Sequence, residues 1–143
     1  MFMGQYHHNV DLKGRIIIPA KFRDELGNII VLTRGLDGCL SVYTQQQWQT
    51  IYEQLIKLPS TKKESRMYVR TFMANAAECE LDNQGRILIP PTLIKSAEIA
   101  KECIVIGSGD HVEIWAKDSW ENFQEKADES LETIAETLTE FIR

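Results

Sequence analysis

Residues 10–19 read VDLKGRIIIP, and residues 81–90 read LDNQGRILIP. The two stretches lie 71 positions apart, as Asp11 and Asp82 do, and Asp, Gly, Arg and Pro are identical at equivalent positions. Three aliphatic residues follow the Arg in both copies. A match of this length indicates an internal repeat, so the chain is expected to be built from two related units.

The repeat extends beyond this motif. Residues 30–32 match residues 104–106, residues 40–43 match residues 112–115, and Trp48 matches Trp120. The offset between the copies changes from 71 to 74 and then to 72. Such a drift indicates short loop insertions between two otherwise similar units.

Each copy predicts strands, tight turns and a short helix. Gly14 and Gly85 stand where a hairpin loop requires a positive φ, which glycine adopts without a Cβ penalty. Pro19 and Pro90 end the strand after that loop and open a helix. We expect these helices over residues 21–26 and 92–101, with further hairpins turning at residues 35–38 and 107–110.

Longer helices are expected after each β-rich unit. Residues 44–47 and 61–64 have the spacing of capping boxes, which predict a helix ending at Pro59 and another over residues 61–76. A last helix is expected from Asp118, with apolar residues three or four positions apart as far as Phe141. That apolar stripe either packs into the core or forms an interface with a neighbouring subunit.

The predicted fold class is α+β, with two tandem β units and flanking helices. The first unit covers residues 5–47 and connecting helices cover residues 48–75. The second unit covers residues 76–119, and an amphipathic C-terminal helix covers residues 120–143.

Composition narrows the class of protein. The chain has 143 residues, of which 43% are hydrophobic and 26% charged, so neither a disordered nor a fibrous protein is expected. Its apolar runs are far shorter than a bilayer span, and its first residues lack the pattern of a signal peptide. Three cysteines without a C-x-x-C spacing favour a reducing cytoplasm. We therefore expect a cytoplasmic protein with no membrane partner.

Charge is divided unevenly along the chain. The net charge is −5, but residues 1–77 hold 10 Lys/Arg against 6 Asp/Glu, whereas residues 78–143 hold 6 against 15. Charges beyond about 8 Å are largely screened at physiological salt, so the local face decides whether DNA can bind. The overall acidity therefore leaves a nucleic-acid partner open.

The loop motif itself has two interpretations. Arg15 and Arg86 follow a glycine at a predicted hairpin tip, and an arginine fork suits phosphate or guanine. Asp11 or Asp82 could accept backbone N–H bonds within its loop, or hold its arginine by an ion pair. On this chemistry the motif either fixes the hairpin alone or also contacts nucleic acid.

The motif D-x-x-G-R-I-x-I-P, its short helix and the strand after it resemble the AbrB/SpoVT swapped-hairpin family of bacterial DNA-binding proteins. Two copies in one chain, with Met3-Gly4-x-Tyr6 at the start and PAKFR at residues 19–23, resemble the two-repeat branch of that family over nearly the whole length. The resemblance implies interleaved hairpins in a pseudo-symmetric barrel. It also implies a transcriptional regulator of its own operon, the division and cell-wall gene cluster, associated with the nucleoid.

The resemblance further implies a ring-shaped, octamer-like homo-oligomer that binds short direct repeats in double-stranded promoter DNA. It assigns DNA binding to Lys13, Arg15 and Arg86, and loop formation to the Asp and Gly positions of the motif. These positions are Asp11, Gly14, Asp82 and Gly85. The second copy has Asn83 and Gln84 in place of Leu12 and Lys13, with two glutamates nearby, so the first copy is expected to contribute more.

Three interpretations of a second basic surface remain open from sequence. One face of a predicted helix holds Lys62, Lys63, Arg66 and Arg70. This face contacts DNA, faces solvent, or pairs with the acidic C-terminal helix within or between subunits. A ring-forming assembly protein on the same fold would not bind DNA. An enzyme is not expected, because no H-E-x-x-H, P-loop or G-x-S-x-G motif occurs. No catalytic residue, metal site or cofactor is predicted, and the cysteines are expected in the interior.

Overall fold

A computed structural model describes residues 1–141. Its strands are β1 (Gln5–Asn9), β2 (Arg15–Ile17), β3 (Ile29–Arg34), β4 (Leu40–Thr44), β5 (Ala77–Glu80), β6 (Arg86–Leu88), β7 (Glu102–Gly107) and β8 (Val112–Ala116). Its helices are α1 (Ala20–Leu26), α2 (Gln45–Leu55), α3 (Lys63–Ala74), α4 (Pro91–Ser96) and α5 (Lys117–Thr137), with a 3-10 turn at Leu36–Gly38. The order of elements repeats after α3, which agrees with an α+β fold made of two copies.

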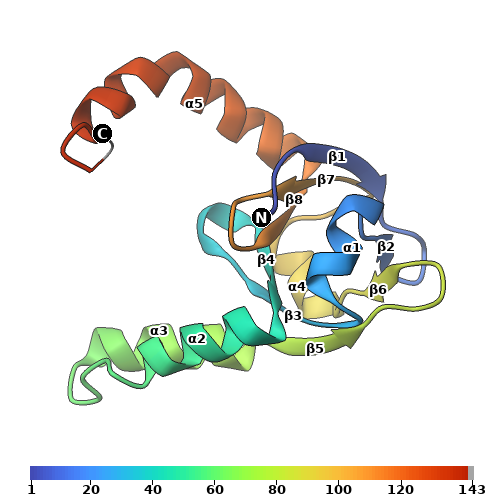
Figure 1. The fold of residues 1–143 in the computed structure, drawn as a ribbon, viewed down its shortest axis with the longest axis horizontal. Coiled ribbons are helices and arrows are strands. Elements are labelled where there is room, and N and C mark those ends of the chain that lie inside the picture. The colour runs from blue at the N-terminus through green and yellow to red at the C-terminus, as the bar shows by residue number, and fades with distance from the viewer. Residues whose placement is uncertain (142–143) are drawn as a thin grey trace.

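The strands of the two repeats pair with each other. The six-stranded sheet has the order β1-β7-β8-β4-β3-β5, and β2 pairs with β6 in a separate two-stranded sheet. The first strand of each repeat therefore pairs with the third strand of the other, β1 with β7 and β5 with β3. Figure 1 shows the result as one β body with α1 and α4 packed on it. Neither repeat completes its sheet alone.

The predicted hairpins are only partly confirmed. The turns at residues 35–38 and 107–110 join antiparallel partners, β3 with β4 and β7 with β8, as predicted. The glycine loops at residues 11–14 and 82–85 do not, because the strands on either side of each loop pair with strands of the other repeat. The expected pseudo-symmetric barrel is also not confirmed by the strand pairing, which leaves the sheet open. Within residues 1–141, β1 and β5 are the two edge strands of an open sheet. The strand that follows each of them, β2 or β6, lies in the separate two-stranded ribbon.

One part of the repeat alignment is shifted by a residue. Ile30 pairs with Cys79, and Cys103 pairs with His8, which is the equivalent of Cys79. Ile30 therefore corresponds to Cys103 and not to Ile104. A shift of one residue exchanges the two faces of a strand, and both Ile30 and Cys103 are fully buried.

The helix ends agree only in part with those predicted from sequence. Thr44 accepts a hydrogen bond from the Gln47 backbone N–H at 3.0 Å, as the capping-box pattern predicts. The helix predicted over residues 92–101 is shorter, because Glu98 has φ +54° and the chain turns to bury Ile99. The predicted start of α3 at Thr61 is wrong: α3 follows Lys62 without a side-chain cap. The last helix begins at Lys117, one residue before the predicted Asp118.

The core lies between the sheet, the ribbon and the two short helices. Phe22 and Leu26 of α1 and Leu93 of α4 are buried in one continuous apolar cluster with the inward side chains of the strands. All three cysteines are buried and unpaired, as predicted. Burial raises the pKa of the Cys39 and Cys103 thiols to about 12, so both are neutral packing groups.

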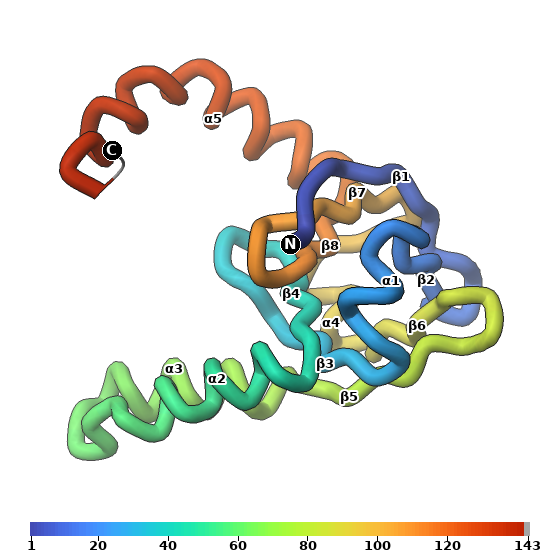
Figure 2. Tube along the Cα trace, in the orientation of Figure 1, coloured from blue at the N-terminus to red at the C-terminus, as the bar shows by residue number. Residues whose placement is uncertain are grey.

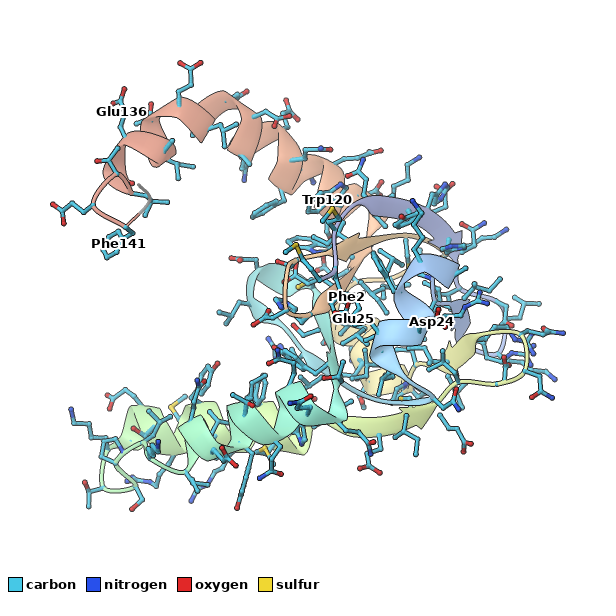
Figure 3. The ribbon with its side chains drawn as sticks, in the orientation of Figure 1. Phe2, Asp24, Glu25, Trp120, Glu136 and Phe141 are labelled. Atoms are coloured by element: carbon cyan, nitrogen blue, oxygen red, sulfur yellow. The ribbon has the colours of Figure 1, made fainter. Side chains whose placement is uncertain are left out.

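The two longest helical segments extend away from this core. Figure 3 shows Trp120 at the base of α5 and Phe141 beyond its far end, away from the sheet. Leu131 and Ile134 on the apolar stripe are exposed by 60% and 44%, so the stripe does not pack into the core of this chain. Residues 142–143 of the predicted C-terminal helix lie outside the described residues. Within residues 1–141, no helix has the length and apolar character needed to cross a membrane.

Candidate nucleic-acid interface

The first loop is closed by the carboxylate of Asp11. One oxygen accepts the backbone N–H groups of Lys13 and Arg15, both at 2.9 Å. The other oxygen accepts the Arg15 Nε–H at 2.8 Å. Both roles considered for this aspartate are therefore present. Gly14, at φ +85°, makes the turn possible.

The second loop repeats this geometry atom for atom. Asp82 accepts the backbone N–H groups of Gln84 and Arg86 at 2.9 Å and the Arg86 Nε–H at 2.7 Å. Gly85 has φ +75°. The motif thus builds the same loop twice, with one arginine clamped at the end of each loop.

The aspartates stay ionised because their loops favour the charged form. The pKa of Asp11 is lowered, first by the backbone N–H of Arg15 and also by its side chain, against a smaller opposing effect of burial. The pKa of Asp82 is lowered for the same reasons by Arg86. Each arginine is therefore held by a carboxylate at neutral pH while the end of its guanidinium stays available, since only Nε is used.

Both arginines lie on the outer face of the β2–β6 ribbon. Arg15 pairs with Leu88, and Arg86 pairs with Ile17, across the two strands. Between them Ile16 pairs with Ile87, whose side chains face the core. The outer face therefore presents two arginines and two exposed aliphatic side chains. The major groove of B-DNA is wide enough to admit a two-stranded ribbon of this kind.

The loops also expose residues at their tips. Lys13 is exposed beside Arg15, and Leu12 is completely exposed. The two loops lie side by side, because Ile18 N–H donates to the Gly85 carbonyl and Ile89 N–H donates to the Gly14 carbonyl, both at 2.9 Å. The structure thus brings Lys13, Arg15 and Arg86 to one end of the molecule, which Figure 2 shows opposite the α2–α3 hairpin and α5.

Arg23 is a residue of this end that the motif did not indicate. It lies on α1, and its Nε–H donates to the Ile18 carbonyl at 2.8 Å. Its guanidinium rests directly on Gly85 of the second loop. The pKa of His8 is lowered, first by burial and then by the charges of Arg23 and His7. A comparison of the two repeats could have pointed to Arg23, because the second repeat has Ile94 at the equivalent position.

The basic face of α3 is not part of this end. Lys62, Lys63, Arg66 and Arg70 lie on the helical arm beyond the opposite side of the sheet (Figure 1). Among residues 1–141, no ion pair joins α3 to α5. Pairing of these helices within one chain is therefore not observed, and the other interpretations of this face stay open.

An aromatic cleft lies between the two helical arms. It has a volume of about 700 Å³, and its lining includes Tyr43, Phe72, Trp115 and Trp120. His111 at its edge contacts Asp110 at 2.7 Å and Glu113 at 2.9 Å. Within residues 1–141, no three His, Cys, Asp or Glu side chains are grouped as metal ligands would be. The cleft is thus a second, separate surface feature.

The chain is similar to known proteins over nearly its whole length. A family model described as "MraZ protein, putative antitoxin-like" matches it twice, over residues 1–71 and 72–142. The curated protein "Transcriptional regulator MraZ" of Ligilactobacillus salivarius (strain UCC118) is 50% identical over 141 residues, 99% of each chain. The protein of the same name from Caldanaerobacter subterraneus subsp. tengcongensis is 55% identical over 141 residues, again 99% of each chain. The one from Thermoanaerobacter pseudethanolicus (strain ATCC 33223 / 39E) is 54% identical over 140 residues, 98% of each chain.

Proposed function

This chain belongs to the MraZ family of transcriptional regulators, and from that premise we propose that it binds promoter DNA with the outer face of its β2–β6 ribbon. Lys13, Arg15 and Arg86 are the residues that make the contact. The target is double-stranded DNA with short direct repeats in the promoter of its own operon, the division and cell-wall gene cluster. The protein then acts in the cytoplasm, on the nucleoid, as a regulator and not as a catalyst.

The observation that carries the proposal is the clamped pair of arginines. Each guanidinium is oriented by an aspartate through Nε, at 2.8 Å for Arg15 and 2.7 Å for Arg86. A side chain that is already ordered loses less conformational entropy when it binds. Its terminal N–H groups suit bidentate contact with guanine or phosphate. Lys13 adds a point charge for a neighbouring phosphate.

A single ribbon of two short strands makes few contacts, so we propose that several act together. A ring-shaped homo-oligomer, octamer-like by resemblance to the family, places several ribbons along one duplex, and each later contact becomes intramolecular. Direct repeats spaced near the helical period of roughly 10 base pairs would then meet successive ribbons on one face. Exposed apolar side chains on the helical arms, such as Met67, Leu131 and Ile134, support self-association there.

The same exposed arms also favour the alternative, a ring-forming assembly protein that does not bind DNA. The two functions differ in what they predict for the ribbon. An assembly protein needs the loops only for folding, so replacing an arginine at the ribbon would leave its interactions unchanged. A regulator loses DNA when that arginine is replaced.

The decisive experiment is a fluorescence anisotropy titration of promoter DNA across a salt series, with scrambled DNA as competitor. Wild type is compared with Arg15→Ala and with Arg34→Ala, which removes an exposed arginine beside the cleft. We expect tight, salt-sensitive binding that prefers the promoter and is abolished in Arg15→Ala but not in Arg34→Ala. Absence of promoter preference in wild type supports the assembly alternative. Unchanged binding by Arg15→Ala moves the DNA site elsewhere, for example to the basic face of α3.

A further inference from the structure

We propose that Arg23 contacts a DNA phosphate at the second loop, and so supplies that loop with the cation that its own sequence lacks. This inference rests on the proposed DNA-binding function. It assigns a binding role to a residue outside both loop motifs. The residue belongs to the first repeat and acts at the loop of the second.

The position of Arg23 beside that loop is fixed by two contacts. Its Nε–H donates to the Ile18 carbonyl at 2.8 Å, and Ile18 N–H donates to the Gly85 carbonyl at 2.9 Å. A Cβ atom at Gly85 would lie 2.3 Å from Cζ of Arg23 and 2.8 Å from its Nη1. The guanidinium therefore occupies the space that only a glycine leaves at this point of the loop.

The two loops compensate for each other in charge. The first loop has Lys13, where the second has Gln84, 71 positions later. The second loop has Arg23 against its glycine, whereas the first has Ile94, whose Cδ1 would lie 3.4 Å from a Cβ at Gly14. Each loop thus combines one aspartate, one clamped arginine and one additional cation. The second loop obtains its additional cation from the other repeat.

The charge of Arg23 is not neutralised by a carboxylate within the described part of the chain. Among residues 1–141, no carboxylate forms an ion pair with its guanidinium. A neutral donor would be enough to cap the Ile18 carbonyl, so capping alone does not require an arginine. The side chain is only partly buried, and a guanidinium has four further N–H donors beyond Nε. Phosphate is the anion that a DNA-binding ribbon meets at this position.

The internal repeat provides the variants for a test. Arg23→Gln removes the charge while an amide can still donate to the Ile18 carbonyl. Gln84→Lys gives the second loop the lysine that the first loop has. Arg34→Gln is the matched control, because it removes the same charge at the opposite end of the molecule. Promoter affinity and its salt dependence are measured by anisotropy, and folding is monitored by thermal melting.

We expect Arg23→Gln to weaken promoter binding on the order of tenfold. The slope of log affinity against log salt should fall in magnitude by about 1, because one phosphate is no longer neutralised. Adding Gln84→Lys to Arg23→Gln restores the affinity and the slope, and an unchanged melting temperature of Arg23→Gln excludes a purely structural role of Arg23. Arg34→Gln changes neither quantity.

Three results overturn the inference. If Arg23→Gln binds as wild type does while Arg15→Ala fails to bind, the regulator function stands and Arg23 contributes only to folding. If Arg23→Gln abolishes binding that Gln84→Lys does not restore, the effect is structural and not one of charge. If wild type itself shows no salt-dependent preference for the promoter, the proposed function fails and this inference fails with it.

Discussion

Ile16 in β2 pairs directly with Ile87 in β6, and these two residues occupy the same position in the two repeats. Ser41 and Glu113, another equivalent pair, face each other in the same way across β4 and β8. Equivalent residues can pair with each other only on an axis of twofold symmetry. The chain therefore has an internal pseudo-twofold axis that passes through the middle of the ribbon, with one clamped arginine on each side.

This pairing makes Ile16 and Ile87 central to stability. They are exposed by 0% and 1% respectively. We expect Ile16→Ala and Ile87→Ala each to lower the free energy of unfolding by about 2–5 kcal/mol, because both leave a cavity in the core. Ile17→Ala, one residue away on the outer face, is the control and is expected to cost under about 1 kcal/mol. Denaturant unfolding at fixed protein concentration measures all three, and equal costs for Ile16 and Ile17 would contradict the assignment of faces.

Asp11→Asn separates loop closure from the orientation of Arg15. An asparagine oxygen can still accept the backbone N–H groups, but its amide nitrogen cannot accept the Arg15 Nε–H. Removal of the negative charge also favours DNA of any sequence. We therefore expect the ratio of promoter to scrambled-DNA affinity to fall while binding to scrambled DNA does not weaken. Competition titrations measure this ratio, and an unchanged ratio would show that the clamp has no part in recognition.

Local pattern predicted most of the elements. The repeat, the cap at Thr44 and the turns within β3–β4 and β7–β8 all depend on residues close in sequence, and the structure confirms them. The positive φ of Gly14 and Gly85 is confirmed as well, although their loops do not join paired strands. The spacing of residues in the motif could not decide whether the aspartate accepts hydrogen bonds from backbone N–H groups or from the arginine side chain. The structure shows that one carboxylate does both.

What failed depends on contacts between distant segments. Periodicity shows that a strand has an inner face but not which strand it pairs with. The pairing of β1 with β7 and of β5 with β3 therefore did not follow from periodicity, and only the family resemblance implied interleaved hairpins. For the same reason, the sequence did not indicate the position of Arg23, which lies far in sequence from the loop that it contacts. The C-terminal stripe has the periodicity of a core helix, yet it is exposed in this chain because no segment of the described residues covers it.

His111 makes stability depend on pH. Its pKa is raised, first by the hydrogen bond with Glu113 and also by Asp110, against the opposing effect of burial. A raised pKa stabilises the fold fully below the ordinary value of 6.5, and this contribution disappears as pH rises through the folded-state pKa. We expect His111→Gln to destabilise the protein more at pH 6 than at pH 9. Thermal melts of both proteins across this range test it, and a pH-independent difference would contradict the ion pairs.

Glu113 sets the lower pH limit of the stabilisation by the His111–Glu113 pair. Burial alone would raise its pKa, but hydrogen bonds with His111 and Trp115 outweigh burial, and the pKa is lowered below its ordinary value of 4.5. Stability from this group is present above that value and disappears as pH falls through the folded-state pKa. The pair therefore stabilises most between about pH 4.5 and 6.5, so Glu113→Gln should remove the benefit in that window.

The exposed stripe of α5 is expected to hold the assembly together and not the single chain. A chain ending at Gln124 keeps Trp120 and Phe123, which pack on Trp115. It lacks Leu131 and Ile134, so we expect cooperative melting to persist while light scattering shows a smaller assembly.

A full-length variant separates the apolar stripe from the length of the helix. Leu131→Ser combined with Ile134→Ser should reduce the assembly as the truncation does. An unchanged mass for both proteins would place the interface elsewhere, whereas an unfolded truncated chain would make α5 part of the folding unit.

Gly85→Ala distinguishes strain in the loop from displacement of Arg23. A Cβ is strained at both glycines, because Gly85 has φ +75° and Gly27 has φ +80° with ψ −179°, a conformation that is essentially restricted to glycine and costs on the order of 1–3 kcal/mol for other residues. Only at Gly85 does that Cβ collide with a guanidinium, because Gly27 has open space around it. Gly27→Ala should therefore lower stability without changing DNA affinity, whereas Gly85→Ala should lower both. In the Arg23→Gln background, Gly85→Ala should cause little further loss of affinity, since the displaced charge is already absent. Additive losses would mean that the glycine and the arginine act on DNA separately.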